Sequence, residues 1–144
     1  MRKGRRKTTK TTDLYRLAEQ SGTQVICYDL PVTHSVSVMT DGGRCYIGID
    51  PFAIETEAQE RVHLAHELGH CKTGAFYSLN SPLETRERQE VRADRWAIRT
   101  LVPADELNVV IGLLVEPWSL AEYFGVTEEF MLKAIEYYKI KGII

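Results

Sequence analysis

The chain has 144 residues, of which 44% are hydrophobic and 26% are charged, as in ordinary soluble globular proteins. This length favours one domain that buries its own core, and no apolar run approaches the roughly 18–20 residues of a membrane span. The basic N-terminus is followed by no apolar stretch, so we expect no signal peptide. The three scattered cysteines, Cys27, Cys45 and Cys71, predict core packing without a disulfide framework, and favour a reducing cytoplasm.

The formal net charge of −2 is distributed unevenly. Residues 1–10 contain six of the 18 basic side chains and no acidic one, so the rest of the chain has an excess of eight acidic residues. We therefore predict a basic flexible tail over residues 1–12, followed by one domain over residues 13–144. The charge excludes a uniformly basic nucleic-acid binder. The tail leaves contact with nucleic acid open, although a solvated tail is the favoured interpretation.

The first half of the domain predicts a short helix and three strands. The helix is expected over Asp13–Gln20. Apolar and β-branched residues predict strands at Gln24–Leu30, Ser35–Thr40 and Arg44–Ile49. Asp41-Gly42-Gly43 is a good hairpin turn between the last two. The pattern indicates an N-terminal helix followed by a short β-meander.

The second half predicts helices. Thr56 and Gln59 fit a capping box that begins a helix running to about Cys71. Further helices are predicted at Arg86–Leu101, Pro103–Leu114, Ser119–Phe124 and Thr127–Lys141. The predicted fold class is α+β, with a core over residues 55–102 and a C-terminal helical segment over residues 103–144. The last two helices have the spacing of a helix-turn-helix.

Residues 66–70 read His66-Glu67-Leu68-Gly69-His70, an H-E-x-x-H motif inside the predicted helix. Because residues i and i+4 project from one face of a helix, His66 and His70 can bind one metal ion. Glu67 lies next to His66 and suits a general base that takes a proton from water activated by the metal. A chance match is the alternative. It is disfavoured because the helix is apolar on two flanks, and buried histidines need partners.

A catalytic zinc site requires a third protein ligand. His63 is close in sequence, but it precedes His70 by roughly 10 Å along the helix axis, so we predict a structural role for it. In the next helix, Glu90 and Asp94 lie one turn apart on an apolar face, where a carboxylate is costly unless it is paired or binds metal. We predict Glu90 as the ligand and Asp94 as the acceptor for the outer N–H of a ligand histidine. The reverse assignment and pairing of both carboxylates with arginines are the alternatives.

With these features the sequence resembles zinc metallopeptidases of the gluzincin type, and more closely the ImmA/IrrE family of small metallo-endopeptidases. The matching segments are Leu64–His70, Glu90–Ala97, Leu101–Pro103 and Leu120–Tyr138. The resemblance covers residues 13–141 and implies a small zincin-like domain of the kind found in prophages and mobile elements.

The resemblance implies zinc ligands at His66, His70 and Glu90, with Glu67 as the catalytic base. It also implies that the substrate is a helix-turn-helix transcriptional repressor, cleaved to release phage or mobile-element genes. From the residues themselves we expect a cytoplasmic protein with no membrane partner. Two alternatives remain: a zinc-containing protein that binds the repressor without cleaving it, and a helix-turn-helix DNA-binding regulator. Acidic residues at the start of the last helix disfavour DNA binding. Tyr77 is a candidate to stabilise the oxyanion, with packing as its alternative role.

Overall fold

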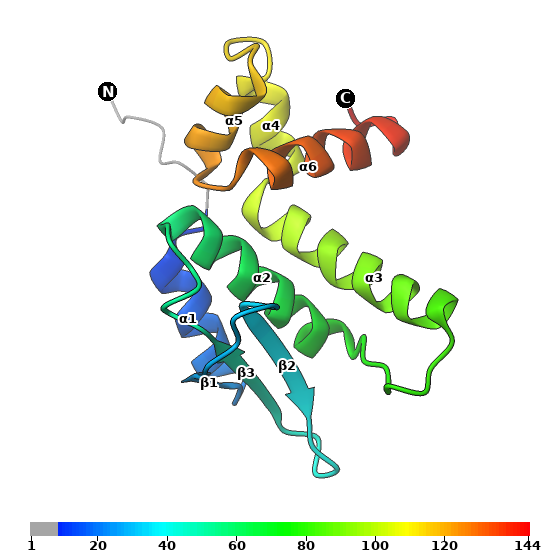
Figure 1. Ribbon diagram of the computed structural model, residues 1–144. Coiled ribbons are helices and arrows are strands. Elements are labelled where there is room, and N and C mark those ends of the chain that lie inside the picture. The colour runs from blue at the N-terminus through cyan, green and yellow to red at the C-terminus, as the bar shows by residue number, and fades with distance from the viewer. Residues whose placement is uncertain (1–8) are drawn as a thin grey trace.

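The structure, a computed structural model, describes residues 9–144 (Figure 1). It is a mixed α+β fold, which confirms the predicted class. Most of the predicted basic tail, including any contact with nucleic acid, lies outside the described residues. The elements are α1 (Thr11–Gln20), β1 (Gln24–Cys27), β2 (Ser35–Met39), β3 (Cys45–Ile49), α2 (Glu57–Thr73), α3 (Leu83–Leu101), α4 (Ala104–Val110), α5 (Pro117–Phe124) and α6 (Glu128–Ile140).

Helix α1 begins at Thr11, inside the segment predicted as tail. The backbone N–H of Lys10 donates to Asp13 Oδ2 at 2.9 Å, so Asp13 satisfies a backbone donor at the start of the helix. Leu14 and Ala18 are buried in the core, which packs α1 against α2. The two residues added at its start precede this apolar face, and Thr11 Oγ1 donates to Glu57 Oε1 of α2 at 2.9 Å.

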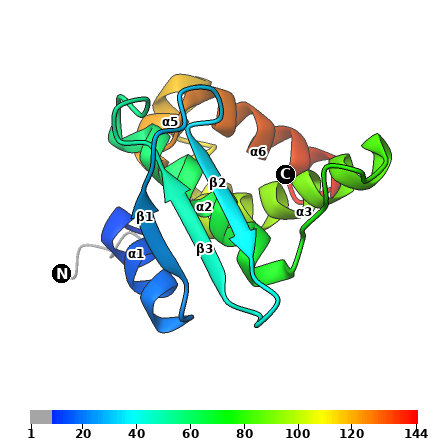
Figure 2. The same ribbon diagram turned by 60° about the horizontal axis from the view of Figure 1, so that its bottom comes forward.

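The three strands form one sheet in the order β1-β3-β2 (Figure 2). Strands β2 and β3 are the predicted antiparallel hairpin, but β1 pairs parallel with β3, so the predicted meander is wrong. The connection from β1 to β2 passes the end of β3, where the buried Asp50 accepts a hydrogen bond from Leu30 N at 2.8 Å. This long-range anchor leaves β2 at one edge of the sheet.

Helix α2 lies at the centre, between the sheet and α3 (Figures 1 and 2). It begins as predicted: Thr56 Oγ1 accepts from Gln59 N at 3.1 Å. It ends at Gly74, whose φ of 66° lies in the left-handed region that glycine tolerates. Leu64 and Leu68 are fully buried. A helix that is covered on both sides by protein can carry polar side chains only where they have partners.

Helices α2 and α3 touch through backbone at Gly69. A Cβ atom placed there would lie 2.5 Å from the carbonyl oxygen of Ala93. We expect Gly69→Ala to force the helices apart, to lower the free energy of unfolding by about 2 kcal/mol, and to weaken metal binding by moving Glu90 away from the histidines. Urea unfolding and a zinc competition titration measure the two effects. Gly112→Ala is the matched control, because nothing lies within 4 Å of a Cβ there. Unchanged stability in Gly69→Ala would contradict the close approach.

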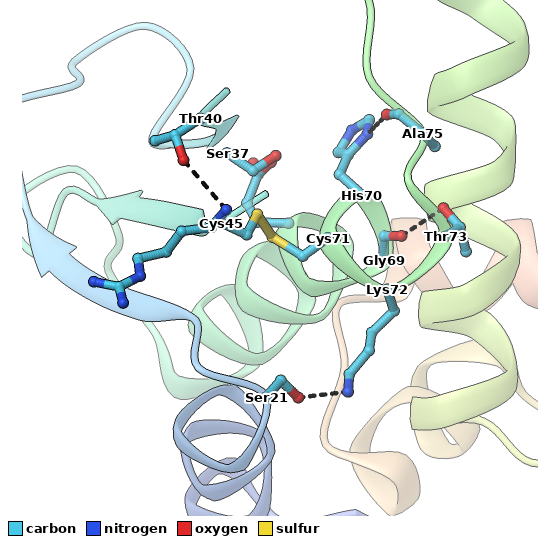
Figure 3. Close-up of a disulfide and its surroundings, with 12 residues drawn as sticks. Ser21, Ser37, Thr40, Cys45, Gly69, His70, Cys71, Lys72, Thr73 and Ala75 are labelled. Atoms are coloured by element: carbon cyan, nitrogen blue, oxygen red, sulfur yellow. Dashed lines mark hydrogen bonds between the residues drawn. A yellow bond between two sulfur atoms is a disulfide. The ribbon is translucent and has the colours of Figure 1, made fainter. Parts of the chain in front are cut away.

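Cys45 and Cys71 form a disulfide that joins the start of β3 to the last turn of α2 (Figure 3). The prediction of unpaired packing cysteines is therefore wrong for these two, because the fold brings together residues 26 positions apart in sequence. Cys27 is free but exposed, so its predicted place in the core is also wrong.

Reduction or removal of this disulfide is expected to lower the stability of the fold. We expect Cys71→Ser to lower the free energy of unfolding by about 3 kcal/mol, because a crosslink that closes a loop of this length restricts the unfolded chain. Urea unfolding with and without a dithiol reductant measures it. Cys27→Ser is the control and should leave stability unchanged. A reductant that fails to bring the wild type to the level of Cys71→Ser would contradict the prediction.

The C-terminal helices gather beyond the end of α3, where α5 and α6 pack on each other and α6 contacts α3 (Figure 1). Thr127, at the predicted start of the last helix, caps α6, with its hydroxyl accepting from Phe130 N at 3.2 Å. Helix α5 begins at Pro117, two residues before the predicted start at Ser119. Tyr138 donates to Val102 O at 2.7 Å and ties α6 to the end of α3. Within residues 9–144, no helix has the length and apolar character to cross a membrane.

Candidate metal centre

Three potential ligands converge between α2 and α3. His66 Nε2 lies 2.8 Å from Glu90 Oε2, and His70 Nε2 lies 3.2 Å from Glu90 Oε1. The two Nε2 atoms are 3.1 Å apart, and ligand atoms of all three residues lie within 4.8 Å of one another. Helix α2 presents both histidines on one face, and the contact of Gly69 with α3 brings Glu90 opposite them.

The outer nitrogens of both histidines contact acceptors. His66 Nδ1 lies 2.8 Å from Asp94 Oδ1, and His70 Nδ1 contacts the carbonyl oxygen of Ala75 (Figure 3). Both partners accept hydrogen bonds, so each ring carries its proton on Nδ1 when neutral, and its Nε2 lone pair faces Glu90. Two imidazole nitrogens and a carboxylate oxygen are ordinary zinc donors, and orienting acceptors at the outer nitrogens are typical of such sites. The residues present therefore fit a divalent metal.

Glu67 is buried next to this group and is held by strand β2. Ser35 Oγ donates to Glu67 Oε2 at 2.7 Å, and Ser37 Oγ donates to Glu67 Oε1 at 2.9 Å. The two serines are two residues apart on the strand, so they face the same side. Sequence reasoning missed both. The alternation Ser-Val-Ser was the available signal, but it does not show what the serines face.

His63 lies outside the three-residue group and points toward β2. Its Nδ1 is 2.9 Å from Ser35 Oγ, and its ring centroid is 5.6 Å from that of His34. Burial lowers the pKa of His63, and the nearby His34 lowers it further. The ring is therefore favoured in its neutral form.

The group opens into a cleft of 910 Å³ between β2, α2, α3 and α6. Tyr77, in the loop after α2, donates to Glu90 Oε1 at 2.9 Å, so it contacts the site directly. On the other side, Lys133 of α6 lies 3.3 Å from Asp94 Oδ2, and Phe130 lines the cleft. The first turns of α6 thus form one wall of the cleft.

The electrostatics of the site favour a proton or a metal ion between the carboxylates. Burial lowers the pKa of His66, but hydrogen bonds to Asp94 and Glu90 outweigh it and raise that pKa to about 10. The hydrogen bonds of Glu90 to His66 and His70 hold its pKa well below the usual value. The raised pKa favours the protonated form of His66 when no cation is bound, and a metal bound at Nε2 would take the place of that proton.

The raised pKa of His66 predicts that the stability of the protein depends on pH once a chelator has removed any metal. The pKa of His66 is raised in the folded state from 6.5 to about 10, so its contribution to stability is complete below pH 6.5 and is lost as the pH rises toward 10. We expect the free energy of unfolding, followed by urea denaturation, to fall over that range. Asp94→Asn removes a main cause of the shift and should flatten the curve. An equally steep fall in Asp94→Asn would contradict this origin.

Together the fold and the site define a class: an α+β domain whose central helix carries H-E-x-x-H and whose next helix places a carboxylate opposite the two histidines, as in metallopeptidases. The chain belongs to the IrrE N-terminal-like domain family of peptidases, whose sequence profile matches residues 18–136. The resemblance to the ImmA/IrrE family is thereby confirmed. Comparison with curated proteins and with solved structures gives no match.

Proposed function

We propose that this chain is a zinc-dependent endopeptidase in which His66, His70 and Glu90 hold the metal and Glu67 is the catalytic base. The observation that carries the proposal is the convergence of the three ligand groups within 4.8 Å, in the same cleft as Glu67. When bound there, zinc supplies Lewis-acid activation of water and of the substrate carbonyl. Calcium and magnesium prefer all-oxygen ligand sets, which disfavours them here.

The other steps of the reaction are assigned to side chains and backbone groups around the metal group. Glu67 takes the proton of the attacking water and passes it to the leaving amine. Asp94 and the Ala75 carbonyl orient the histidine rings. Tyr77, whose hydroxyl lies at the site through its hydrogen bond to Glu90, is the proposed donor to the oxyanion that develops on the substrate carbonyl.

We further propose that the substrate is a helix-turn-helix transcriptional repressor, and that cleavage derepresses phage or mobile-element genes. Family membership supports a protein substrate, and the open cleft beside an edge strand supports an extended peptide segment. The repressor itself is a prediction from the family resemblance, and a cytoplasmic location is a prediction from the sequence. The place of α6 in the cleft wall, and its acidic Glu128 and Glu129, support a role in the peptidase site over DNA binding.

The test uses the full chain loaded with zinc. It is incubated with the helix-turn-helix protein encoded beside its gene, and separately with a peptide library prepared from a proteome, and new N-termini are identified by mass spectrometry. We expect cleavage that stops when zinc is removed by a chelator and returns when zinc is restored. Tight binding of the repressor without cleavage would identify a non-catalytic antirepressor. Metal-independent binding to duplex DNA would favour the DNA-binding alternative.

A further inference from the structure

The geometry points to a further set of positioning residues: Ser35 and Ser37 of β2, with His63 behind Ser35, hold Glu67 through a directed chain of hydrogen bonds. This inference rests on the proposed function, because it concerns the residue proposed as the base. It goes beyond that function by giving strand β2 a part in preparing Glu67 for its role.

The Glu67 carboxylate accepts a hydrogen bond at each of its two oxygens. An ionised carboxylate only accepts hydrogen bonds. Its two oxygens are each met by one serine hydroxyl, at 2.7 Å from Ser35 and 2.9 Å from Ser37. Both serines must therefore donate, and the pair fixes the plane of the carboxylate as well as its position.

The two contacts of Ser35 determine which ring nitrogen of His63 carries the proton. A serine hydroxyl has one proton, and that of Ser35 is directed at Glu67. Ser35 must then accept from its other neighbour, His63 Nδ1, at 2.9 Å. The neutral His63 ring therefore carries its proton on Nδ1. The direction of donation runs from His63 to Ser35 to Glu67.

These hydrogen bonds keep Glu67 in one position beside the metal group. Glu67 neighbours His66 on the helix and faces the same cleft as the metal group. A carboxylate free to rotate there could bind the metal itself and would be lost as a base. The two hydroxyls on β2 hold it on the sheet side, because strand alternation directs residues 35 and 37 together toward α2. A displacement of about 1 Å in a reacting group is enough to cost roughly 100-fold in rate.

An NMR experiment tests these hydrogen bonds and needs no measurement of peptidase activity. In zinc-loaded, ¹⁵N-labelled protein, two-bond nitrogen–proton correlation spectra report which ring nitrogen of each histidine is protonated. We expect His63 to carry its proton on Nδ1 in the wild type and to lose this preference in Ser35→Ala. A proton on Nε2 in the wild type, or an unchanged Nδ1–H form in Ser35→Ala, would overturn the chain.

A second experiment measures how the hydrogen bonds from β2 to Glu67 affect catalysis. It uses a peptide that the wild type cleaves in the library assay. We expect Ser37→Ala to lower kcat about 10-fold with KM unchanged, because the peptide still binds while the base is poorly held. Ser37→Thr keeps a hydroxyl and suits a strand, so it should restore kcat. Ser119→Ala, on the distant α5, is the matched control and should behave as the wild type. Thermal unfolding of each variant separates misfolding from misplacement of Glu67.

The outcomes separate the two proposals. Equal kcat in Ser37→Ala and in the wild type, or a failure of Ser37→Thr to restore it in a folded protein, would overturn the role of β2 while leaving the peptidase function intact. If the wild type cleaves neither the repressor nor any library peptide, the proposed function fails, and the tautomer of His63 still decides whether the hydrogen-bond chain exists.

Discussion

Replacing Glu67 by glutamine is expected to abolish peptide hydrolysis while leaving the fold and the metal in place. Removal of a general base costs about 10²–10⁴-fold in rate. The amide of glutamine has nearly the same shape as the carboxylate but cannot take up a proton from water. Because a serine hydroxyl can accept as well as donate, Ser35 and Ser37 can still bond to the amide at both of its atoms.

Three measurements on Glu67→Gln check this expectation. Initial rates on the cleaved peptide should fall to near background, elemental analysis should find zinc at the wild-type ratio, and urea unfolding should give a similar free energy. Glu87→Ala, an exposed acidic residue on α3, is the control for loss of an acid outside the cleft. A Glu67→Gln protein that retains zinc and full hydrolysis would show that the base lies elsewhere.

Loss of Glu90 is expected to have the largest effect on the metal. One carboxylate oxygen lies 2.8 Å from His66 Nε2 and the other 3.2 Å from His70 Nε2, so Glu90→Ala removes one of the three converging residues. We expect zinc affinity to fall by more than about 100-fold, and by roughly 10- to 100-fold in Asp94→Asn, where only the orienting partner of His66 is lost.

Competition with a chromophoric chelator measures both affinities, and Glu87→Ala again serves as the control on the same helix. The ranking of the two variants is the decisive result. If Asp94→Asn lost zinc completely and Glu90→Ala kept it, the assignment of ligand and orienting residue would be reversed. If neither variant changed the affinity, the metal would be bound at another place.

Much of the site follows from local periodicity. The four-residue spacing of His66 and His70 places them on one helical face whatever surrounds them, and the same spacing relates Glu90 to Asp94. An acidic pair on an apolar face is itself a signal, because an unpaired buried carboxylate is costly. The convergence of His66, His70 and Glu90 was therefore predictable in outline. Their roles as zinc ligands, and that of Asp94 as orienting residue, stay predictions.

Other features depend on contacts between distant segments and could not be predicted. The parallel position of β1 beside β3 is one of them, since local strand patterns do not encode the order of strands. The Cys45–Cys71 disulfide and the serine contacts of Glu67 arise in the same way, from the packing of the sheet on α2.

The sequence by itself determined the α+β class, the helix that carries the motif, its cap at Thr56 and the residue types able to bind a metal. These are short-range properties: hydrogen bonds within a turn, and the period at which apolar residues recur. Only the tertiary structure decided which carboxylate meets the histidines, what holds Glu67, and that α6 forms a wall of the cleft. Those outcomes depend on how closely α2 and α3 approach at Gly69 and on which strand lies at the sheet edge, and both are set by packing across the whole core.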